Sequence, residues 1–272
     1  MIVTPERIVY SGLLGAPSRR MHGALTVYVA HETQFEIGID DGPMLRAWLA
    51  VVPPNHVHVI ASCDRLVRDI LVEPESARGA ELSAGSALTV TDRSDPAFAH
   101  VQQAFDAWLA GRDFADASTP ELDQFFFGRT LAPRELDPRI RRIVNRIRVQ
   151  PHEHISAATC ARLSGLSFSR FVHLFKQEIG MTFRAFCAWK RARAVLPSMT
   201  RPCNLTQLAL EAGYPDSTHF SHSIRRIFGL RPRDILAGSQ RLSLCCTGSA
   251  GIMWTPTVTG SAARFRAVAA FG

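Results

Sequence analysis

Residues 156–180 read SAATCARLSGLSFSRFVHLFKQEIG, and this stretch decides the fold of the chain. Ser156 is a candidate N-cap for a helix over residues 157–164, and Ser167 caps a second helix over 168–179. Gly165 lies between the two helices and permits a sharp turn. The second helix has one apolar face, formed by Phe171, Leu174 and Phe175. Two helices joined by a short glycine turn predict a helix-turn-helix unit.

A second copy follows at a period of about 49 residues. Residues 204–229 read NLTQLALEAGYPDSTHFSHSIRRIFG. Asn204 is the candidate cap, and Gln207 can reach back to it as in a capping box. The turn is one residue longer than in the first copy. The matching positions are Ala209 with Ala161, Gly213 with Gly165, Phe220 with Phe171, Ile224 with Phe175, Arg225 with Lys176 and Gly229 with Gly180. Because glycine, apolar and cation positions all agree, the sequence predicts two helix-turn-helix units.

The segment between the copies, 182–196, predicts a helix capped by Thr182. Phe183, Phe186, Trp189 and Val195 have roughly helical spacing, and basic residues fill much of the remainder: Arg184, Lys190, Arg191 and Arg193. A helix of about 15 residues would span about 22 Å. That length suits a spacer that lets both units meet one face of a duplex, where the major groove recurs every ~34 Å.

The charge of the chain is divided unevenly. Residues 1–136 carry 11 Lys and Arg against 18 Asp and Glu, whereas residues 137–237 carry 17 against 6, a net charge of +11. Residues 238–272 add 3 cations and no acidic residue. Fifteen of the 17 cations in the middle segment are arginines, whose guanidinium groups can bond two phosphate oxygens at once. This split favours an acidic partner for the middle segment, although a solvated surface explains charge alone equally well.

The two copies resemble a known family. The run from Leu163 to Phe183 resembles the first helix-turn-helix unit of AraC/XylS-family transcription regulators, and the run from Ala209 to Pro232 resembles the second. The resemblance covers about 100 residues, and it implies a seven-helix DNA-binding domain in which a long helix joins the two units. The chain departs from the family at Ile224, where the family usually has Phe. It departs again at Pro197, which can end the joining helix early.

The resemblance also assigns roles to the exposed faces of the second helices. The expected base-reading residues are Ser169, Val172, His173, Thr218, Ser221 and His222. The expected phosphate-binding residues are Arg170, Lys176, His219, Arg225 and Arg226. A solvated helix face is the alternative for each cation. A zinc site is the alternative for the histidines, but no thiol or carboxylate completes a ligand set nearby in sequence.

The N-terminal half has the pattern of a β-rich domain. Short apolar runs separated by turn residues predict strands at 8–10, 25–30, 35–39, 45–52, 57–61 and 66–72. Helical spacing then predicts helices over 96–109 and 121–127. The run Trp48-Leu-Ala-Val-Val-Pro-Pro-Asn-His-Val-His looks like the small cupin-type barrels that many AraC-type regulators use to sense effectors. Three consecutive phenylalanines, Phe125, Phe126 and Phe127, cannot all face one way, so the helices either pack on the barrel or also form a dimer interface.

His22, His56 and His58 are the candidate effector-pocket residues. Hydrogen bonding in a turn or at the barrel mouth is the simpler interpretation. Metal-dependent catalysis is the alternative from another class, in which a cupin enzyme is fused to a DNA-targeting module. However, the HxH…E arrangement of metal-using cupins is missing ahead of the Pro-Pro turn, and no cysteine pair has zinc-finger spacing. We therefore expect no metal, no cofactor and no enzyme activity.

The expected fold class is α+β, with a small cupin-like β-barrel and appended helices followed by an all-α DNA-binding domain. The expected divisions are 1–130 for effector sensing, 131–237 for DNA binding and 238–272 for a disordered tail, with a docked C-terminal element as the alternative. The expected function is sequence-specific transcription regulation under a small-molecule effector; a non-specific nucleic-acid scaffold is a third hypothesis. Duplex DNA is the main expected partner, RNA polymerase and a second copy are further candidates, and a cytoplasmic, non-membrane location is expected.

Overall fold

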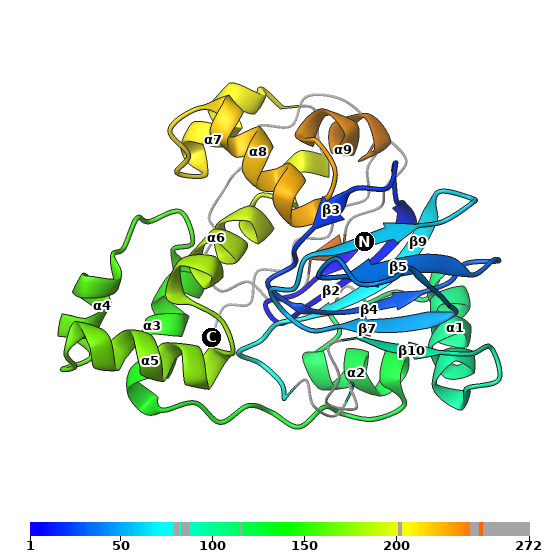
Figure 1. The fold of residues 1–272 in the computed structure, drawn as a ribbon, viewed down its shortest axis with the longest axis horizontal. Coiled ribbons are helices and arrows are strands. Elements are labelled where there is room, and N and C mark those ends of the chain that lie inside the picture. The colour runs from blue at the N-terminus through cyan, green and yellow to red at the C-terminus, as the bar shows by residue number, and fades with distance from the viewer. Residues whose placement is uncertain (79–81, 83–87, 115, 201–202, 240–244, 247–272) are drawn as a thin grey trace.

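The structure is a computed structural model that describes residues 1–78, 82, 88–114, 116–200, 203–239 and 245–246. A sheet-rich N-terminal half and a helical C-terminal half lie side by side (Figure 1). This architecture confirms the coarse fold class predicted from the sequence, a sheet-rich N-terminal part followed by a helical C-terminal part. None of the described helices is long and apolar enough to cross a lipid bilayer.

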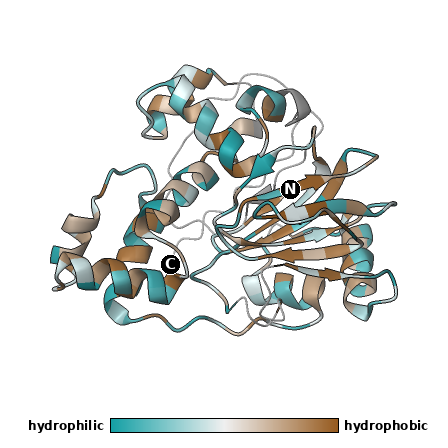
Figure 2. Cartoon of the chain, viewed as in Figure 1, coloured by the Kyte–Doolittle hydropathy of each residue, from teal (hydrophilic) through white to brown (hydrophobic). Residues whose placement is uncertain are grey.

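Two sheets form the N-terminal half, and every described strand pair except β1 with β11 is antiparallel. The larger sheet contains, in spatial order, β10 (Thr89–Thr91), β7 (Leu49–Val52), β4 (Leu25–Val29), β9 (Leu66–Val72), β2 (Arg7–Leu13), β1 (Ile2–Val3) and β11 (Cys245–Cys246). The smaller sheet contains β3 (Arg19–Arg20), β8 (His58–Ala61), β5 (Phe35–Ile39) and β6 (Leu45–Ala47). The strands are rich in hydrophobic residues (Figure 2), as a core between two sheets requires.

The closed barrel expected from the sequence is not seen, because neither described sheet closes on itself. The run predicted as one strand over 45–52 is interrupted at Trp48, and its two parts, β6 and β7, belong to different sheets. The two sheets share one buried cluster, in which the rings of Tyr28 and Phe35 lie 6.3 Å apart. The apolar residues are therefore buried by packing one open sheet on the other.

Two helices pack beside the sheets, α1 (Pro96–Leu109) and α2 (Thr119–Phe127) (Figure 1). The bounds of α1 agree with the prediction. Helix α2 begins two residues before the predicted start, because Ser118 and Glu121 form a reciprocal capping box. Phe126 is fully buried, whereas Phe125 and Phe127 are partly buried against the same cluster. All three phenylalanines thus find contacts within the chain.

The described part of the C-terminal half contains α3 (Pro138–Val149), α4 (Ala157–Leu163), α5 (Phe168–Ile179), α6 (Phe183–Ala194), a 3-10 turn (Ser198–Thr200), α7 (Leu205–Glu211), α8 (Ser217–Phe228) and α9 (Pro232–Ser239). The predicted caps at Ser156, Ser167, Thr182 and Asn204 are confirmed, since each side chain accepts a backbone N–H of its helix. Asp137 caps α3 in the same way. The predicted capping box at Gln207 is wrong, because its side-chain amide donates to Glu211 at 2.8 Å. Helix α6 has 12 residues and ends before Pro197, as a proline at that position favours.

The first two residues of the predicted tail, 238 and 239, belong to α9, which extends to Ser239. Cys245 and Cys246 pair in parallel with Ile2 and Val3, so this dipeptide docks on the sheet instead of forming part of a structureless tail. The pairing satisfies backbone groups that β1 would otherwise expose at the sheet edge. The rest of the predicted tail, 240–244 and 247–272, lies outside the described residues.

Candidate DNA-binding surface

Helix α5 buries one face and exposes the opposite one. Phe171 and Phe175 are completely buried and pack with Phe183 and Phe186 of α6. Of the predicted base-reading residues on α5, Ser169 and His173 are exposed and Val172 is half-buried. Arg170 and Lys176, predicted to bind phosphate, are also exposed. Because the aromatic face anchors the helix, these five side chains lie on a rigid element at the surface.

Helix α8 repeats this arrangement with a stronger N-cap. Asp216 accepts the backbone N–H groups of Thr218 and His219, both at 2.8 Å, and these bonds hold the pKa of its carboxyl below the usual value. Asp216 also bonds the His219 ring at 2.7 Å, so this histidine is tied to the cap. Thr218 and His222 are exposed, and Ser221 is half-buried. The sequence offered Asn204 as a cap but did not identify Asp216, although aspartate before a helical run is a recognised N-terminal signal.

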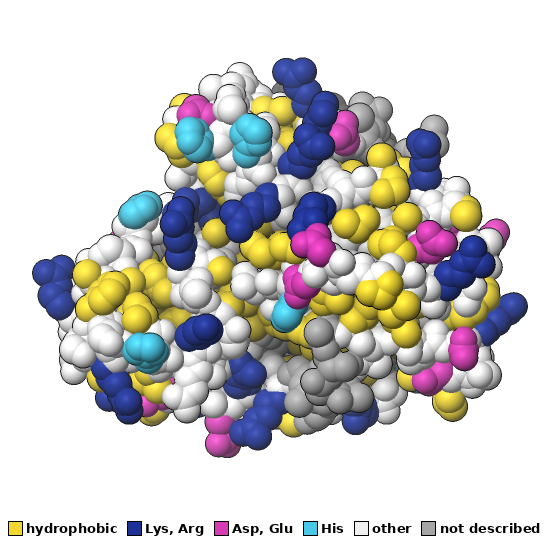
Figure 3. Space-filling view, in the orientation of Figure 1, with side chains coloured by type: hydrophobic (Ala, Val, Ile, Leu, Met, Phe, Trp, Pro, Cys, Tyr) yellow, Lys and Arg dark blue, Asp and Glu magenta, His cyan; other side chains and the backbone are white. Residues whose placement is uncertain are grey.

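The cations of the helical half divide into two groups. Arg225 and Arg226 of α8 are exposed, like the cations of α5, and basic and histidine side chains gather over this half in Figure 3. Lys190 and Arg193 of α6, by contrast, face carboxylates of the same chain, and the Lys190 side chain is only 4% exposed. An acidic partner therefore cannot reach Lys190 and Arg193, although the net charge of +11 for residues 137–237 includes both.

The first and second units touch through the loop before α4. A Cβ atom at Gly213 would lie 2.6 Å from the carbonyl oxygen of His152, and Gly213 has φ +74°. The turn of the second unit therefore needs glycine both for its left-handed backbone and for the close approach of His152. This contact ties the loop before α4 to the turn of the second unit.

The candidate effector residues are not gathered into one group. His22 and His58 are buried with their rings 5.3 Å apart, and burial lowers the pKa of both imidazoles, to about 4 for His58. His22 bonds Thr26 at 2.9 Å, and His58 bonds the Tyr28 hydroxyl at 2.8 Å. His56 instead bonds Asp40 at the surface. Among the described residues, no group of three or more His, Cys, Asp or Glu side chains could hold a metal ion.

Two buried charges beside these histidines were missed by the sequence reasoning. Arg20 is 4% exposed, and its Nε and Nη2 atoms have no hydrogen-bond partner among the described residues. Asp69 is 7% exposed, and burial raises the pKa of its carboxyl to about 7 even though Arg20 opposes that shift. Arg20 lies in β3 and Asp69 in β9, and alternation along a strand predicts only which face a residue takes. The sequence therefore carried no sign that the two faces meet.

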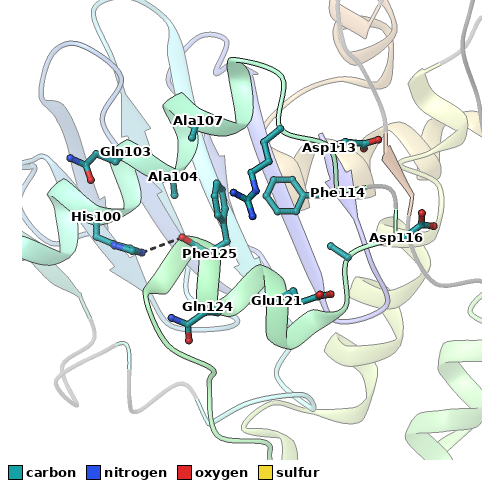
Figure 4. Close-up of a pocket in the computed structure, with 12 residues that line it drawn as sticks. His100, Gln103, Ala104, Ala107, Asp113, Phe114, Asp116, Glu121, Gln124 and Phe125 are labelled. Atoms are coloured by element: carbon teal, nitrogen blue, oxygen red, sulfur yellow. Dashed lines mark hydrogen bonds between the residues drawn. The ribbon is translucent and has the colours of Figure 1, made fainter.

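A pocket of about 820 Å³ lies elsewhere, between α1 and α2 and the loop that joins them (Figure 4). Arg112 stacks over the Phe125 ring at 4.7 Å, and His100 bonds the Phe125 carbonyl. None of the candidate effector residues lines this pocket. It is a feature of the appended helices and is separate from the space between the sheets.

Comparison with known sequences supports the assignment of the helical half. The family described as a helix-turn-helix domain matches residues 160–238, the segment that holds both reading helices. Invasion protein InvF of Salmonella typhimurium is 32% identical over 72 residues, 26% of this chain and 33% of that protein. The probable transcriptional regulator LumQ of Photobacterium leiognathi is 30% identical over 93 residues, 33% of this chain and 37% of that protein. The chain thus spans about a third of the length of the curated relatives it matches.

Solved structures extend the likeness to both halves. ToxT from Vibrio cholerae aligns with a TM-score of 0.60 at 11% identity, over 87% of this chain and 98% of that one. ToxT with a bound unsaturated fatty acid aligns at 0.51 and 9% identity, over 85% and 94%. At such identities the likeness shows the shared fold alone. The family match is confined to residues 160–238, which are similar to a helix-turn-helix domain.

Proposed function

We propose that the whole chain is a sequence-specific transcription regulator that reads duplex DNA with α5 and α8. One observation carries the proposal: two capped helices occupy matching positions in a repeat, and each exposes a short polar face opposite a buried aromatic one. Recognition helices of helix-turn-helix proteins enter the major groove with such a face. A non-specific scaffold would need only the positive charge.

The exposed residues divide by chemistry into two roles. We assign base reading to Ser169, Val172, His173, Thr218, Ser221 and His222, because hydroxyl, imidazole and methyl groups match the major-groove edges of bases. We assign phosphate binding to Arg170, Lys176, His219, Arg225 and Arg226, because charged groups at the rim of a reading face meet the backbone. His219 keeps this role only while its bond to Asp216 orients it.

The test is a selection of random duplex DNA on the full-length chain at near-physiological salt. We expect an enriched site that contains two short blocks of preferred base pairs, one for each helix-turn-helix unit, about one helical turn apart. His222→Ala should relax base preference at one position, at a cost of ~1–3 kcal/mol there, whereas Arg225→Ala should weaken all sequences alike. Equally tight binding to every duplex would refute the proposal. Identical behaviour of the two variants would refute the division into reading and positioning residues.

We further propose that the two-sheet half is a cupin-like domain that senses an amphipathic carboxylate such as a fatty acid. The support is chemical: Arg20 is a buried cation beside His22, His58 and Tyr28. Its Nε and Nη2 atoms have no hydrogen-bond partner among the described residues, and unbonded guanidinium donors in a buried site are costly. The fatty acid bound to ToxT, which shares this fold, suggests the ligand class. RNA polymerase and a second copy of the chain stay predicted partners.

The neighbouring arginine provides a control for this effector site. Arg19 is exposed and paired with Asp41 at 2.5 Å, whereas Arg20 is buried. Oleate should raise the melting temperature of the wild type and of Arg19→Gln, and it should have little effect on Arg20→Gln. Equal shifts in both variants would show that the carboxylate binds elsewhere. The metal-dependent enzyme hypothesis has no supporting observation among the described residues.

A further inference from the structure

The two reading units differ in how they are built into the molecule. The first unit has its own buried cluster, formed by residues of α3, α4, α5 and α6 and their connections, such as Ile143, Phe171 and Phe186. The second unit instead shares one cluster with the N-terminal sheet. That cluster joins Phe220 and Ile224 of α8 to the following residues of the N-terminal half: Met1, Val3, Ile8, Ala24 and Leu71. The second unit thus lacks a core that is separate from the sheet.

Ser18 and Met21, the residues on either side of β3, hold the C-terminal end of α8 directly. The Met21 amide donates to the carbonyl oxygens of Arg226 at 3.0 Å and Ile227 at 3.3 Å. The Ser18 hydroxyl donates to the Gly229 carbonyl at 2.7 Å, and a Cβ atom at Gly229 would lie 2.7 Å from Arg20 Nε. Figure 1 shows the end of α8 lying over β3. The last carbonyls of a helix have no partner within it, so these donors satisfy groups that otherwise bond water.

The matching end of α5 is held differently. Gly180 occupies the same cap position with φ +86°, and a Cβ atom there would meet nothing within 4 Å. The nearby Glu178 carbonyl accepts a hydrogen bond from Arg134, which belongs to the segment leading into α3. Contacts to the N-terminal sheets therefore distinguish α8 from α5 at equivalent positions of the repeat.

The joining helix α6 is fastened to the sheet half as well. Glu73, which follows β9, is completely buried and accepts the Trp189 indole N–H at 2.9 Å, while its other oxygen lies 2.6 Å from Arg193 Nε. Lys190 bridges Glu73 and Glu75. Burial raises the pKa of Glu73, but Lys190 and Arg193 outweigh it, so the pKa lies below its usual value. A buried ion group with these partners allows one register of α6 on the sheet, since any shift would leave a charge unpaired.

We propose that the N-terminal sheets position the second recognition helix, with Ser18, Arg20 and Glu73 as positioning residues. This inference rests on the proposed DNA reading. We call the hydrogen bonds of Ser18 and Met21 to the C-terminal end of α8 the clamp. The clamp leaves the exposed Thr218 and His222 uncovered. It therefore sets where the second helix stands relative to the first, and so determines the spacing between the two DNA blocks. The first unit, with its own core, should read its block whether or not the clamp is intact.

The repeat supplies the matched pair of variants for the test. Gly229→Ala and Gly180→Ala impose the same left-handed strain on a helix cap, but only Gly229→Ala intrudes on Ser18 and Arg20. Random duplex DNA is selected on each full-length variant. Gly229→Ala should lose at least tenfold in enrichment of one block and keep the other. Gly180→Ala should keep both blocks at the wild-type spacing. If Gly229→Ala folds and keeps both blocks at that spacing, or if both variants lose the same block, the inference is overturned.

A milder variant covers the case in which Gly229→Ala does not fold. Ser18→Ala removes only the hydroxyl that bonds the Gly229 carbonyl. We expect it to select both blocks over a wider range of spacings, and we expect Ser18→Thr, which keeps a hydroxyl, to restore the wild-type spacing. Unchanged spacing in Ser18→Ala would overturn the inference and leave DNA reading intact. Absence of any enriched block in the wild type would overturn the proposed function and this inference together.

Discussion

Asp69 is a buried carboxyl, and its replacement by asparagine should stabilise the protein increasingly as pH rises. It lies in β9, at the centre of the larger sheet, and it pairs with Tyr28 of β4 on one side and with Tyr10 of β2 on the other. Its carboxyl is 7% exposed, its Oδ1 atom has no partner among the described residues, and burial raises its pKa from 3.8 to about 7. The folded state therefore binds a proton that the unfolded state releases.

The sign and size of the effect follow from this difference in protonation. A group whose pKa is raised by folding contributes stability at low pH and loses that contribution as pH rises toward the folded pKa. Between pH 5 and about 7 the unfolded chain has released the proton and the folded chain has kept it. Each pH unit changes the free energy of unfolding by about 1.4 kcal/mol, so two units amount to about 3 kcal/mol. Asparagine cannot ionise, and Asp69→Asn should therefore gain about 3 kcal/mol over the wild type between pH 5 and pH 8.

Urea unfolding of both proteins at pH 5 and pH 8 measures this gain. The buried histidines His22 and His58 also titrate on unfolding, but they are present in both proteins, so their contribution cancels in the comparison. Asp41→Asn is the control, because Asp41 is fully exposed and its pairing with Arg19 lowers its pKa. It should show no gain with rising pH. A difference between Asp69→Asn and the wild type that stays the same at both pH values would refute the reasoning about this carboxyl.

Three further predictions concern the helical half. Gly213→Ala should destabilise the chain by about 1–3 kcal/mol more than Gly165→Ala in urea unfolding. Both glycines have a positive φ, but only a Cβ atom at Gly213 would meet the His152 carbonyl oxygen. Equal losses of stability would contradict the contact between the two units. Arg225→Ala should reduce the slope of log affinity against log salt concentration by about 1, measured by fluorescence anisotropy on duplex DNA, and an unchanged slope would remove Arg225 from the phosphate contacts. Ser156→Ala should cost about 1 kcal/mol through loss of the α4 cap, and a change in urea midpoint smaller than the measurement error would show that water replaces the hydroxyl.

Local chemistry made the helical half predictable from its sequence. The caps at Ser156, Ser167 and Asn204 bond to groups two or three residues away, and the buried face of α5 follows from a repeat of three to four residues. The exposed positions of Ser169, His173 and Thr218 follow from the same period. The duplication then distinguished this pattern from an ordinary amphipathic helix, because two independent segments placed the same residue types in register.

The N-terminal half was predictable as a set of strands but not as a sheet arrangement. The bounds of β5 and β9 agree with the apolar runs, since β-branched and apolar residues favour strands locally. The break at Trp48, which sends β6 and β7 into different sheets, depends on which distant strands are available to pair with each part. The barrel predicted from the Pro-Pro turn was therefore replaced by two open sheets.

What the sequence by itself determined is the presence of two helix-turn-helix units, the caps of three of their four helices, and which face α5 and α8 each expose. Only the tertiary structure decided that Lys190 is not available to DNA, because its partner Glu75 lies 115 residues away along the chain. It likewise decided that Arg20 and Asp69 are buried near each other and that Ser18 and Met21, on either side of β3, hold the end of α8. Capping and helical period are set by neighbours within about four residues. The burial and pairing of a charge are set by whichever segments the fold brings against it, and no local pattern contains that information.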